Sequence, residues 1–278
     1  MVLKLLTYVV IAVIATAVLY ANRATCQVVT KELVSYWTFD NADIQGKTLK
    51  DLWGNNDGTI MGDFNIVSGK VGEALELPGL KAGADYVEIA ENDSLDPPNL
   101  TYMAWIKLNA ATDYGNVISH DDGSGLGHCL QTRGATDTFR MWVVVNGVID
   151  NAESSTTVSS CVGKWTHLAG TYDGKTITLY LNGVLDGSKD KPGKAKCTQK
   201  TPLAIGGQFG GNAGTNELIN GVVDEACIYN RALSADEIIQ NMNAEGLALN
   251  STGKLAFTWG EIKASTGDHF KPGAKGYR

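Results

Sequence analysis

Alternation of apolar and polar side chains with a period of two residues is the feature that most limits how this chain can fold. In residues 139–145 a Phe, a Met and two Val occupy every second position, with Arg, Trp and Val between them. Residues 177–181 repeat the pattern with Ile, Leu and Leu. Because neighbouring side chains of a strand point to opposite faces, this alternation predicts strands with one buried face.

Glycine-containing turn dipeptides follow the alternating segments. They are Asn146-Gly147, Asp173-Gly174 and Asn182-Gly183. Asn-Gly and Asp-Gly pairs favour tight β-hairpins, because both turn positions take positive φ. Further strands are predicted at 33–39, 73–77, 85–89, 100–108, 116–119, 128–132, 165–172, 203–206 and 221–229.

One helix is predicted near the end of the strand-rich region. Ser234 and Glu237 have the spacing of a capping box, in which each side chain bonds the other residue's backbone amide. Ile238 and Met242 continue an apolar stripe, and Gly246 ends it. Many short strands with one short helix predict an all-β antiparallel fold, either a two-sheet sandwich or a barrel.

Composition narrows the functional classes. The chain has 278 residues, of which 44% are hydrophobic, so it can bury a real core. Charged residues make up only 19% of the chain, which argues against a coiled coil. The formal net charge of −7 makes nucleic acid a poor partner, because binding to phosphates is driven by basic surfaces.

The N-terminus has the pattern of an export signal. Residues 5–20 are apolar and follow Lys4. A helix that spans a membrane needs roughly 20 residues, and this run is shorter. We expect residues 1–26 to be a signal peptide, with an uncleaved membrane anchor as the alternative. Residues 27–246 would then form one domain and residues 247–278 a C-terminal tail. The expected location is outside the cell or at its surface.

Four cysteines lie in the predicted domain. An oxidising compartment favours disulfides, and buried free thiols are the alternative. Cys161 and Cys197 flank the central hairpins in polar segments, so we expect them to pair. Cys129 and Cys227 remain, and they can pair only if their Cα atoms lie within about 7 Å. The sequence contains no CxxC pair and no histidines at metal-ligand spacing, so it does not predict a zinc site.

Several stretches together resemble one family, and they occur in that family's order. They are ELVSYWTFD at 32–40, DLWGNNDGTIMG at 51–62, GKVGEALEL at 69–77, DYVEI at 85–89, GKWTHLAGTYDGKTITLYLNG at 163–183 and GVVDEACIYNRALSADEI at 221–238. With these, the chain resembles laminin-G-like domains of the concanavalin A-type jelly-roll superfamily. The resemblance implies a two-sheet antiparallel jelly-roll sandwich with one short C-terminal helix. It also implies extracellular binding, often of carbohydrate.

The resemblance further implies a calcium site where the first strand, the loop after it and the last strand meet. The matching oxygen donors are Asp40, Asn56, Asp57 and Asp224. Calcium takes six to eight oxygen ligands from carboxylates and loop carbonyls. The alternative is that Asp57 and Gly58 only turn the chain and Asp224 caps a loop.

Catalysis is not predicted. Glycan-cleaving relatives of this fold carry two or three carboxylates on one face of one strand, and no predicted strand here does. Asp224 and Glu225 are adjacent, so on a regular strand they would point to opposite faces. The same argument separates His128 from Cys129, which therefore do not form a nucleophilic pair.

We expect a non-catalytic binding or adhesion module that recognises glycans or glycoproteins. The alternatives are a structural cell-surface protein that acts through protein–protein contacts, and a glycan hydrolase. Most tryptophans are expected in the core, because they fall within strands. Binding groups usually lie on loops over a rigid scaffold, so the candidate ligand-binding residues are Tyr114, Asp121, Asp122, Arg133 and Asn212.

Overall fold

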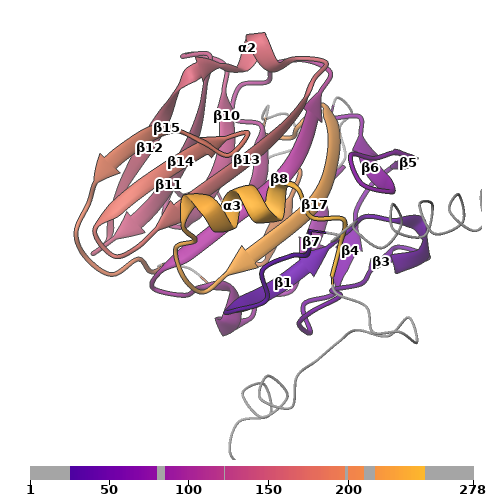
Figure 1. Ribbon diagram of the computed structural model, residues 1–278, viewed down its shortest axis with the longest axis horizontal. Helices are drawn as coiled ribbons and strands as arrows, with labels where there is room; N and C mark the ends of the chain where they lie inside the picture. Colours follow the sequence, from indigo (N-terminus) through magenta and orange to yellow (C-terminus); the bar gives the residue numbers. More distant parts are fainter. Residues whose placement is uncertain (1–25, 80–84, 122, 198–199, 210–216, 248–278) are drawn as a thin grey trace, which may run out of the picture.

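Two antiparallel β-sheets packed face to face make up most of the molecule (Figure 1). The structure is a computed structural model that describes residues 26–79, 85–121, 123–197, 200–209 and 217–247. Helices are few and short. The architecture confirms the predicted two-sheet jelly-roll sandwich.

The first sheet has eight strands. Its order is β15-β14-β13-β8-β17-β6-β5, and β1 pairs with β17 beside this path. The strands are β1 (Leu33–Trp37), β5 (Asn65–Ser68), β6 (Glu73–Leu77), β8 (Leu100–Leu108), β13 (Trp165–Tyr172), β14 (Thr176–Leu181), β15 (Val184–Asp190) and β17 (Gly221–Tyr229).

The second sheet has nine strands, in the order β12-β11-β10-β9-β16-β7-β4-β3-β2. The strands are β2 (Ile44–Gln45), β3 (Thr48–Leu49), β4 (Gly58–Ile60), β7 (Val87–Ile89), β9 (Asn116–His120), β10 (His128–Arg133), β11 (Thr138–Val145), β12 (Val148–Thr157) and β16 (Leu203–Ile205). Short helical turns connect strands at η1 (Asn41–Asp43), η2 (Asp93–Leu95) and α2 (Val158–Cys161).

The inner faces of the two sheets share one continuous core. Phe139, Met141 and Val143 of β11 are fully buried, as their alternation predicts. Ile177 and Leu179 of β14, in the opposite sheet, belong to the same cluster. The period-two pattern therefore identifies the faces that hold the sheets together.

Two of the three predicted turn dipeptides take positive φ at both positions, and at Asp173-Gly174 only the glycine does. Asn146 and Gly147 have φ angles of 53° and 76°, and Asn182 and Gly183 have φ angles of 49° and 78°. Two successive residues with positive φ match the right-handed twist of the flanking strands. The turns join β11 to β12 and β14 to β15.

Helix α3 (Ala235–Met242) lies across the outer face of the eight-stranded sheet (Figure 1). The Ser234 hydroxyl accepts a hydrogen bond from the Glu237 amide at 3.3 Å, and the Glu237 carboxylate accepts one from the Ser234 amide at 2.9 Å. This reciprocal pair confirms the predicted capping box. Below the helix, Ile238 packs with Met103 in a second buried cluster.

Strand β17 contains a bulge, where its register against β8 shifts between Asp224 and Cys227. Glu225, within the bulge, has a φ of 52°. Val223 and Ala226 both belong to the main core, which leaves both carboxylates on the outer side of the sheet. The expectation that Asp224 and Glu225 point to opposite faces is therefore wrong, because a bulge breaks the simple alternation.

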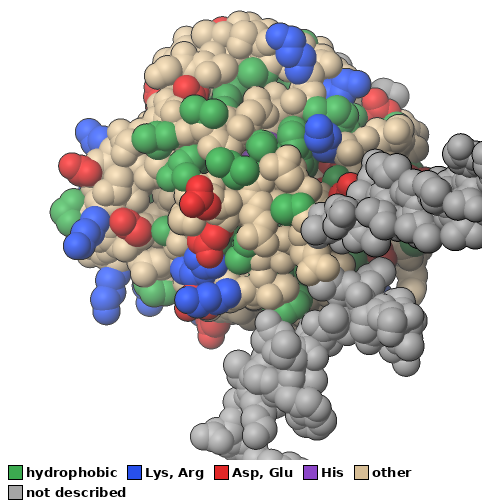
Figure 2. Space-filling model, viewed as in Figure 1, with side chains coloured by type: hydrophobic (Ala, Val, Ile, Leu, Met, Phe, Trp, Pro, Cys, Tyr) green, Lys and Arg blue, Asp and Glu red, His purple; other side chains and the backbone are tan. Residues whose placement is uncertain are grey.

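On the face that carries α3, acidic and basic side chains are interspersed among uncharged surface (Figure 2). Among the described residues, we find no helix with the length and apolar character needed to span a membrane. Residues 1–25 and 248–278, which hold most of the predicted signal peptide and tail, lie outside the described part of the chain.

Candidate functional site

A small depression with a volume of ≈ 200 Å³ lies on the outer side of the nine-stranded sheet. Its floor comes from β9, β10 and β11, and its rim comes from the loops at their ends. The lining residues are Tyr114, Asn116, Asp121, Gly123, Gly125, Gln131, Arg140, Trp142, Ile149, Gln208 and Glu217. We call this depression the groove.

Strand register explains why the polar side chains of the groove share one face. Gln131 of β10 lies opposite Arg140 of β11, and it also pairs with Asn116 of β9. Leu130 directly precedes Gln131, and Met141 directly follows Arg140. Both of these apolar side chains point to the inner face and belong to the core. The alternation that builds the core therefore also builds the floor of the groove.

Hydrogen bonds hold this floor in place. The Arg140 Nε donates to the Gln131 Oε1 at 2.6 Å, and the Gln131 Nε2 donates to the Asn116 Oδ1 at 2.6 Å. The Arg140 guanidinium lies 5.5 Å from the centre of the Tyr114 ring and 5.9 Å from that of Trp142. Both distances fall within the range of cation–π attraction. Burial lowers the pKa of Arg140 from its ordinary value, and the group stays charged.

The rim is fixed by the carboxylate of Asp121. Its oxygens accept hydrogen bonds from the amides of Gly123 at 2.8 Å and Leu126 at 2.9 Å. The Gln208 side chain also donates to it, at 2.9 Å. On the floor, the Trp142 Nε1 is buried and has no hydrogen-bond partner among the described residues. The groove therefore has a rim that hydrogen bonds hold rigid.

The structure brings two of the predicted ligand-binding residues to this groove. Tyr114 and Asp121 line it, and Arg133 lies beside it, with its guanidinium 5.5 Å from the Tyr114 ring. Asp122 and Asn212 lie outside the described residues.

Sequence reasoning missed the residues of the groove floor. Asn116, Gln131, Arg140 and Trp142 all lie within strands, and the prediction considered loops. Trp142 is buried, as expected, with 6% of its surface exposed, but it lies outside the main core cluster and lines the groove. The alternation over residues 139–145 carried the missing signal, because it already placed positions 140 and 142 opposite the core.

A second group of polar side chains lies where β1 and β6 meet the bulge of β17. The Asp224 Oδ2 accepts hydrogen bonds from the amides of Lys70 at 2.7 Å and Val71 at 3.0 Å. The Asp40 Oδ1 accepts one from the Glu73 amide at 2.6 Å. Two of the four predicted calcium ligands, Asp40 and Asp224, therefore converge on the loop before β6.

The carboxyl groups in this region destabilise one another's charged forms. Burial raises the pKa of Asp224 to about 7, against the hydrogen bonds from the Val71 and Lys70 amides, and the Asp40 carboxylate adds to the rise. Burial also raises the pKa of Glu225 to about 8, although its hydrogen bond from the Tyr36 hydroxyl opposes the shift. Within the described chain, the buried Asp224 Oδ1 has no hydrogen-bond partner. A cation would neutralise this concentration of negative charge.

The other two predicted calcium ligands lie elsewhere. The Asp57 carboxylate forms an ion pair with Lys50 at 2.6 Å and accepts the Asp51 amide at 3.0 Å. The Asn56 side chain donates to the Ser35 hydroxyl at 2.8 Å, and its amide donates to Asp51. Both side chains have hydrogen-bond partners that shape the loop, and of the four predicted calcium ligands the structure brings Asp40 and Asp224 together.

The structure also corrects the predicted disulfide. All five cysteines are free. Cys161 is the last residue of α2 and lies two residues before Gly163. The Gly163 amide donates a hydrogen bond to the Leu108 carbonyl, at one end of β8. Cys197 bonds Asp96, which precedes the other end of this nine-residue strand. A strand of that length spans about 26 Å, far beyond disulfide reach.

The remaining cysteines are also kept apart. Cys129 lies on the outer side of the nine-stranded sheet, where its thiol donates to the Asn116 side chain at 3.0 Å. Cys227 lies on the outer side of the eight-stranded sheet, in the cluster under α3. The two side chains point away from each other across the whole sandwich, so they cannot pair.

Two antiparallel sheets packed as a jelly roll define a concanavalin A-like fold. The chain belongs to the concanavalin A-like lectin/glucanases superfamily, because the Laminin_G_3 family model of that superfamily matches residues 81–239. This confirms the laminin-G-like resemblance. Mouse (Mus musculus) pappalysin-1 is 32% identical over 105 residues, which are 35% of this chain and 6% of that protein. The chain therefore corresponds to a small part of that relative.

Solved structures with the same fold are binding domains in several cases. Domain 4 of AbnA, a GH43 extracellular arabinanase from Geobacillus stearothermophilus in complex with arabinotriose, superposes with a TM-score of 0.60 and 20% identity, over 76% of this chain and 98% of that domain. The binding domain of Paraclostridial Mosquitocidal Protein 1 superposes with a TM-score of 0.59 and 19% identity, over 76% of this chain and 52% of that chain. The binding domain of botulinum neurotoxin DC in complex with SialylT superposes with a TM-score of 0.56 and 14% identity, over 80% of this chain and 54% of that chain. These similarities show the fold.

Proposed function

We propose that this protein is a non-catalytic, extracellular glycan-binding module, and that the groove holds the sugar. The single observation that carries the proposal is the composition of the groove. The rings of Tyr114 and Trp142 both lie within cation–π distance of the Arg140 guanidinium. The side-chain amides of Asn116 and Gln131 line the same groove. Sugars offer apolar faces for aromatic rings and hydroxyl groups for fixed polar side chains.

The size and stiffness of the groove suit a short segment of a glycan. The groove is smaller than the pockets that enclose drug-sized ligands, so it fits one or a few sugar units rather than a large buried molecule. The hydrogen bonds among Asn116, Gln131 and Arg140 fix the floor before any ligand arrives, which lowers the ordering cost of binding. Complexes of arabinotriose and SialylT with domains of the same fold support a carbohydrate ligand.

A binding role also fits the state of the rim carboxylate. The Asp121 oxygens already accept three backbone amides and the Gln208 side chain, so this group serves to hold the loop. An acid or base for glycoside cleavage needs a second carboxylate at a defined distance and freedom to exchange a proton.

The experiment is a glycan array followed by calorimetry with each glycan that binds. Tyr114→Ala and Trp142→Ala should each weaken binding by about 10-fold or more, since loss of an aromatic contact costs about 1–2 kcal/mol. Tyr180→Ala, on the other sheet, is the matched control and should keep the affinity. If none of the glycans on the array binds, the proposal is rejected. Hydrolysis of a polysaccharide by the purified protein would favour an enzyme instead.

We also propose that calcium binds between Asp40 and Asp224. The Asp224 Oδ1, which no described residue contacts by a hydrogen bond, and the raised pKa values of both carboxyl groups support a cation here. Backbone carbonyls of the loop before β6 would complete the oxygen ligands that calcium takes. The site lies on the eight-stranded sheet, so its role would be to join β1, β6 and β17.

A further inference from the structure

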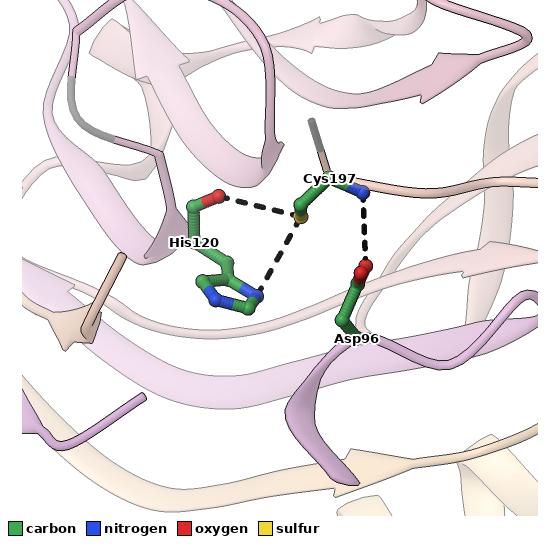
Figure 3. A group of neighbouring side chains, drawn as sticks. All are labelled: Asp96, His120 and Cys197. Carbon is green, nitrogen blue, oxygen red and sulfur yellow. Dashed lines mark hydrogen bonds between the residues drawn. The ribbon is translucent and has the colours of Figure 1, made fainter. Parts of the chain in front are cut away.

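A cluster of three metal-ligating side chains lies at one end of the sandwich, apart from the groove and from the Asp40–Asp224 pair. Asp96 follows η2, His120 ends β9, and Cys197 follows β15 (Figure 3). Each residue offers one ligand atom, and these three atoms all lie within 4.8 Å of one another. His120 and Cys197 are buried, with exposed fractions of 2% and 5%.

The His120 ring is in the tautomer that binds metals. Its Nε2 lies 2.9 Å from the carbonyl oxygen of Thr201, which can only accept a hydrogen bond. The proton is therefore on Nε2, and the lone pair of Nδ1 points toward the cluster. Burial, with His128 nearby, lowers the pKa of His120 from its ordinary value. A metal-ligating histidine commonly donates its other N–H to a backbone carbonyl in this way.

The distance between the sulfur and the nitrogen also fits a metal. The Cys197 Sγ lies 3.6 Å from the His120 Nδ1 (Figure 3). Tetrahedral zinc, with bonds of about 2.3 Å to sulfur and about 2.0–2.1 Å to nitrogen, places its two ligand atoms about 3.5–3.6 Å apart. The Asp96 carboxylate is anchored next to them, because it accepts the Cys197 amide at 3.0 Å.

The side chain of a fourth residue, His128, points at the cluster. The His128 Nδ1 accepts the Val144 amide at 3.3 Å, so its proton is on Nε2. That Nε2 is fully buried, has no hydrogen-bond partner in the part of the chain that the structure describes, and lies 3.4 Å from the Asp96 Oδ1. Although burial acts to raise it, His128 and the Cys197 amide hold the pKa of Asp96 below its ordinary value. The His128 N–H therefore faces the carboxylate that is one of the three ligand groups of the cluster.

We propose that Asp96, His120 and Cys197 form a site for a divalent zinc-class ion, with His128 orienting the carboxylate. Thiolate, imidazole and carboxylate together favour zinc over calcium, which takes oxygen ligands. Binding forms a metal–sulfur bond and releases the thiol proton to solvent. The ion would join the segment before β8, the end of β9 and the segment after β15, three segments distant in the sequence.

The same residues do not form a nucleophilic pair. Burial and the neighbouring Asp96 carboxylate both raise the pKa of the Cys197 thiol, whereas a reactive cysteine needs a lowered one.

The test uses the untagged full chain with cobalt(II) as the spectroscopic probe and zinc(II) as the competitor. We expect one cobalt per chain, a near-ultraviolet thiolate-to-cobalt charge-transfer band, and loss of the band on addition of zinc. Cys197→Ser should abolish the band and weaken metal binding at least 100-fold, and Cys129→Ser, another buried thiol, should leave both unchanged. His128→Gln should weaken binding about 10- to 100-fold and keep the one-to-one stoichiometry.

Absence of a thiolate band in the wild-type protein would overturn the proposal, as would a band that persists in Cys197→Ser. If Cys197→Ser does not fold, single serine substitutions of Cys26, Cys129, Cys161 and Cys227 decide the matter. A band that survives all four assigns the thiolate to Cys197, and a band lost with any of them assigns it elsewhere.

Discussion

Asp224 shows how strongly the surroundings of one side chain set its chemistry. The carboxyl group is fully buried at a bulge, and two backbone amides bind only one of its oxygens. Burial favours the neutral form, the neighbouring Asp40 carboxylate adds to this effect, and the pKa rises to about 7 although backbone amides oppose the rise. Trp142 is a second case, because one step along the strand separates a core position from the floor of the groove.

Calcium-free protein should become less stable as the pH rises. The pKa of Asp224 is about 7 in the folded protein and about 3.9 in an unfolded chain, so its contribution is complete below pH 4 and is lost as the pH rises through 7. A shift of this size corresponds to at most about 4 kcal/mol. Melting temperatures measured in chelator should fall between pH 5 and pH 8, after correction for the other titrating groups.

Asp224→Asn should flatten this pH dependence, because the amide oxygen can still accept from Lys70 and Val71 but cannot ionise. Asp63→Asn, at an exposed acid, serves as the control and should leave the slope unchanged. Equal slopes for the wild type and Asp224→Asn would show that Asp224 does not carry the effect.

At the scale of single elements, local sequence signals and tertiary contacts act together. Helix α3 starts where its capping box predicts, and it is held down by Ile238 against the sheet. Strand β17 behaves differently. Its bulge divides it into a half that pairs with β6 and a half that pairs with β1, and that division creates the pocket for Asp224.

Ser234→Ala should destabilise the protein by about 1 kcal/mol, because the Glu237 amide loses its side-chain acceptor at the start of α3. The change should appear as a lower midpoint in urea with an unchanged denaturant slope. Ser188→Ala, at an exposed position of β15, is the matched control. A midpoint equal to that of the wild type would mean that the capping box does not stabilise the helix.

At the scale of the whole molecule, the two sheets separate three sites. The groove lies on the outer side of the nine-stranded sheet, and the Asp40–Asp224 pair lies on the outer side of the other sheet. The Asp96–His120–Cys197 cluster lies at one end of the sandwich. The Asp40–Asp224 pair is therefore separated from the groove by the thickness of the sandwich, whereas His120 of the cluster directly precedes Asp121 of the groove rim.

Calcium at millimolar concentration should raise the melting temperature of chelator-treated protein. A ligand that binds only the folded state adds about 2.7 kcal/mol at a hundredfold excess over its Kd. Asp224→Asn should abolish the increase, and Asp57→Asn should keep it, since Asp57 pairs with Lys50 instead. Superimposable melting curves in chelator and in calcium would exclude the site.

Reducing agent should leave the melting temperature unchanged, because the cysteines are free and geometrically separated. The companion measurement is alkylation of the unfolded, unreduced protein, which should modify every cysteine. Recovery of a peptide that joins Cys161 to Cys197 would contradict the structure.

The sequence alone determined the all-β class, the hairpin turns, the capped helix and the family, because these depend on local periodicity, turn chemistry and short contiguous motifs. It also singled out Tyr114 and Asp121, two loop residues beside strand ends that line the groove. Only the tertiary structure decided the rest. Four features depend on how distant segments align: the bulge at Asp224, the ion pair of Asp57 with Lys50, the separation of Cys161 from Cys197, and the contact between Asp96 and His120. Local sequence patterns do not determine which remote strands pair.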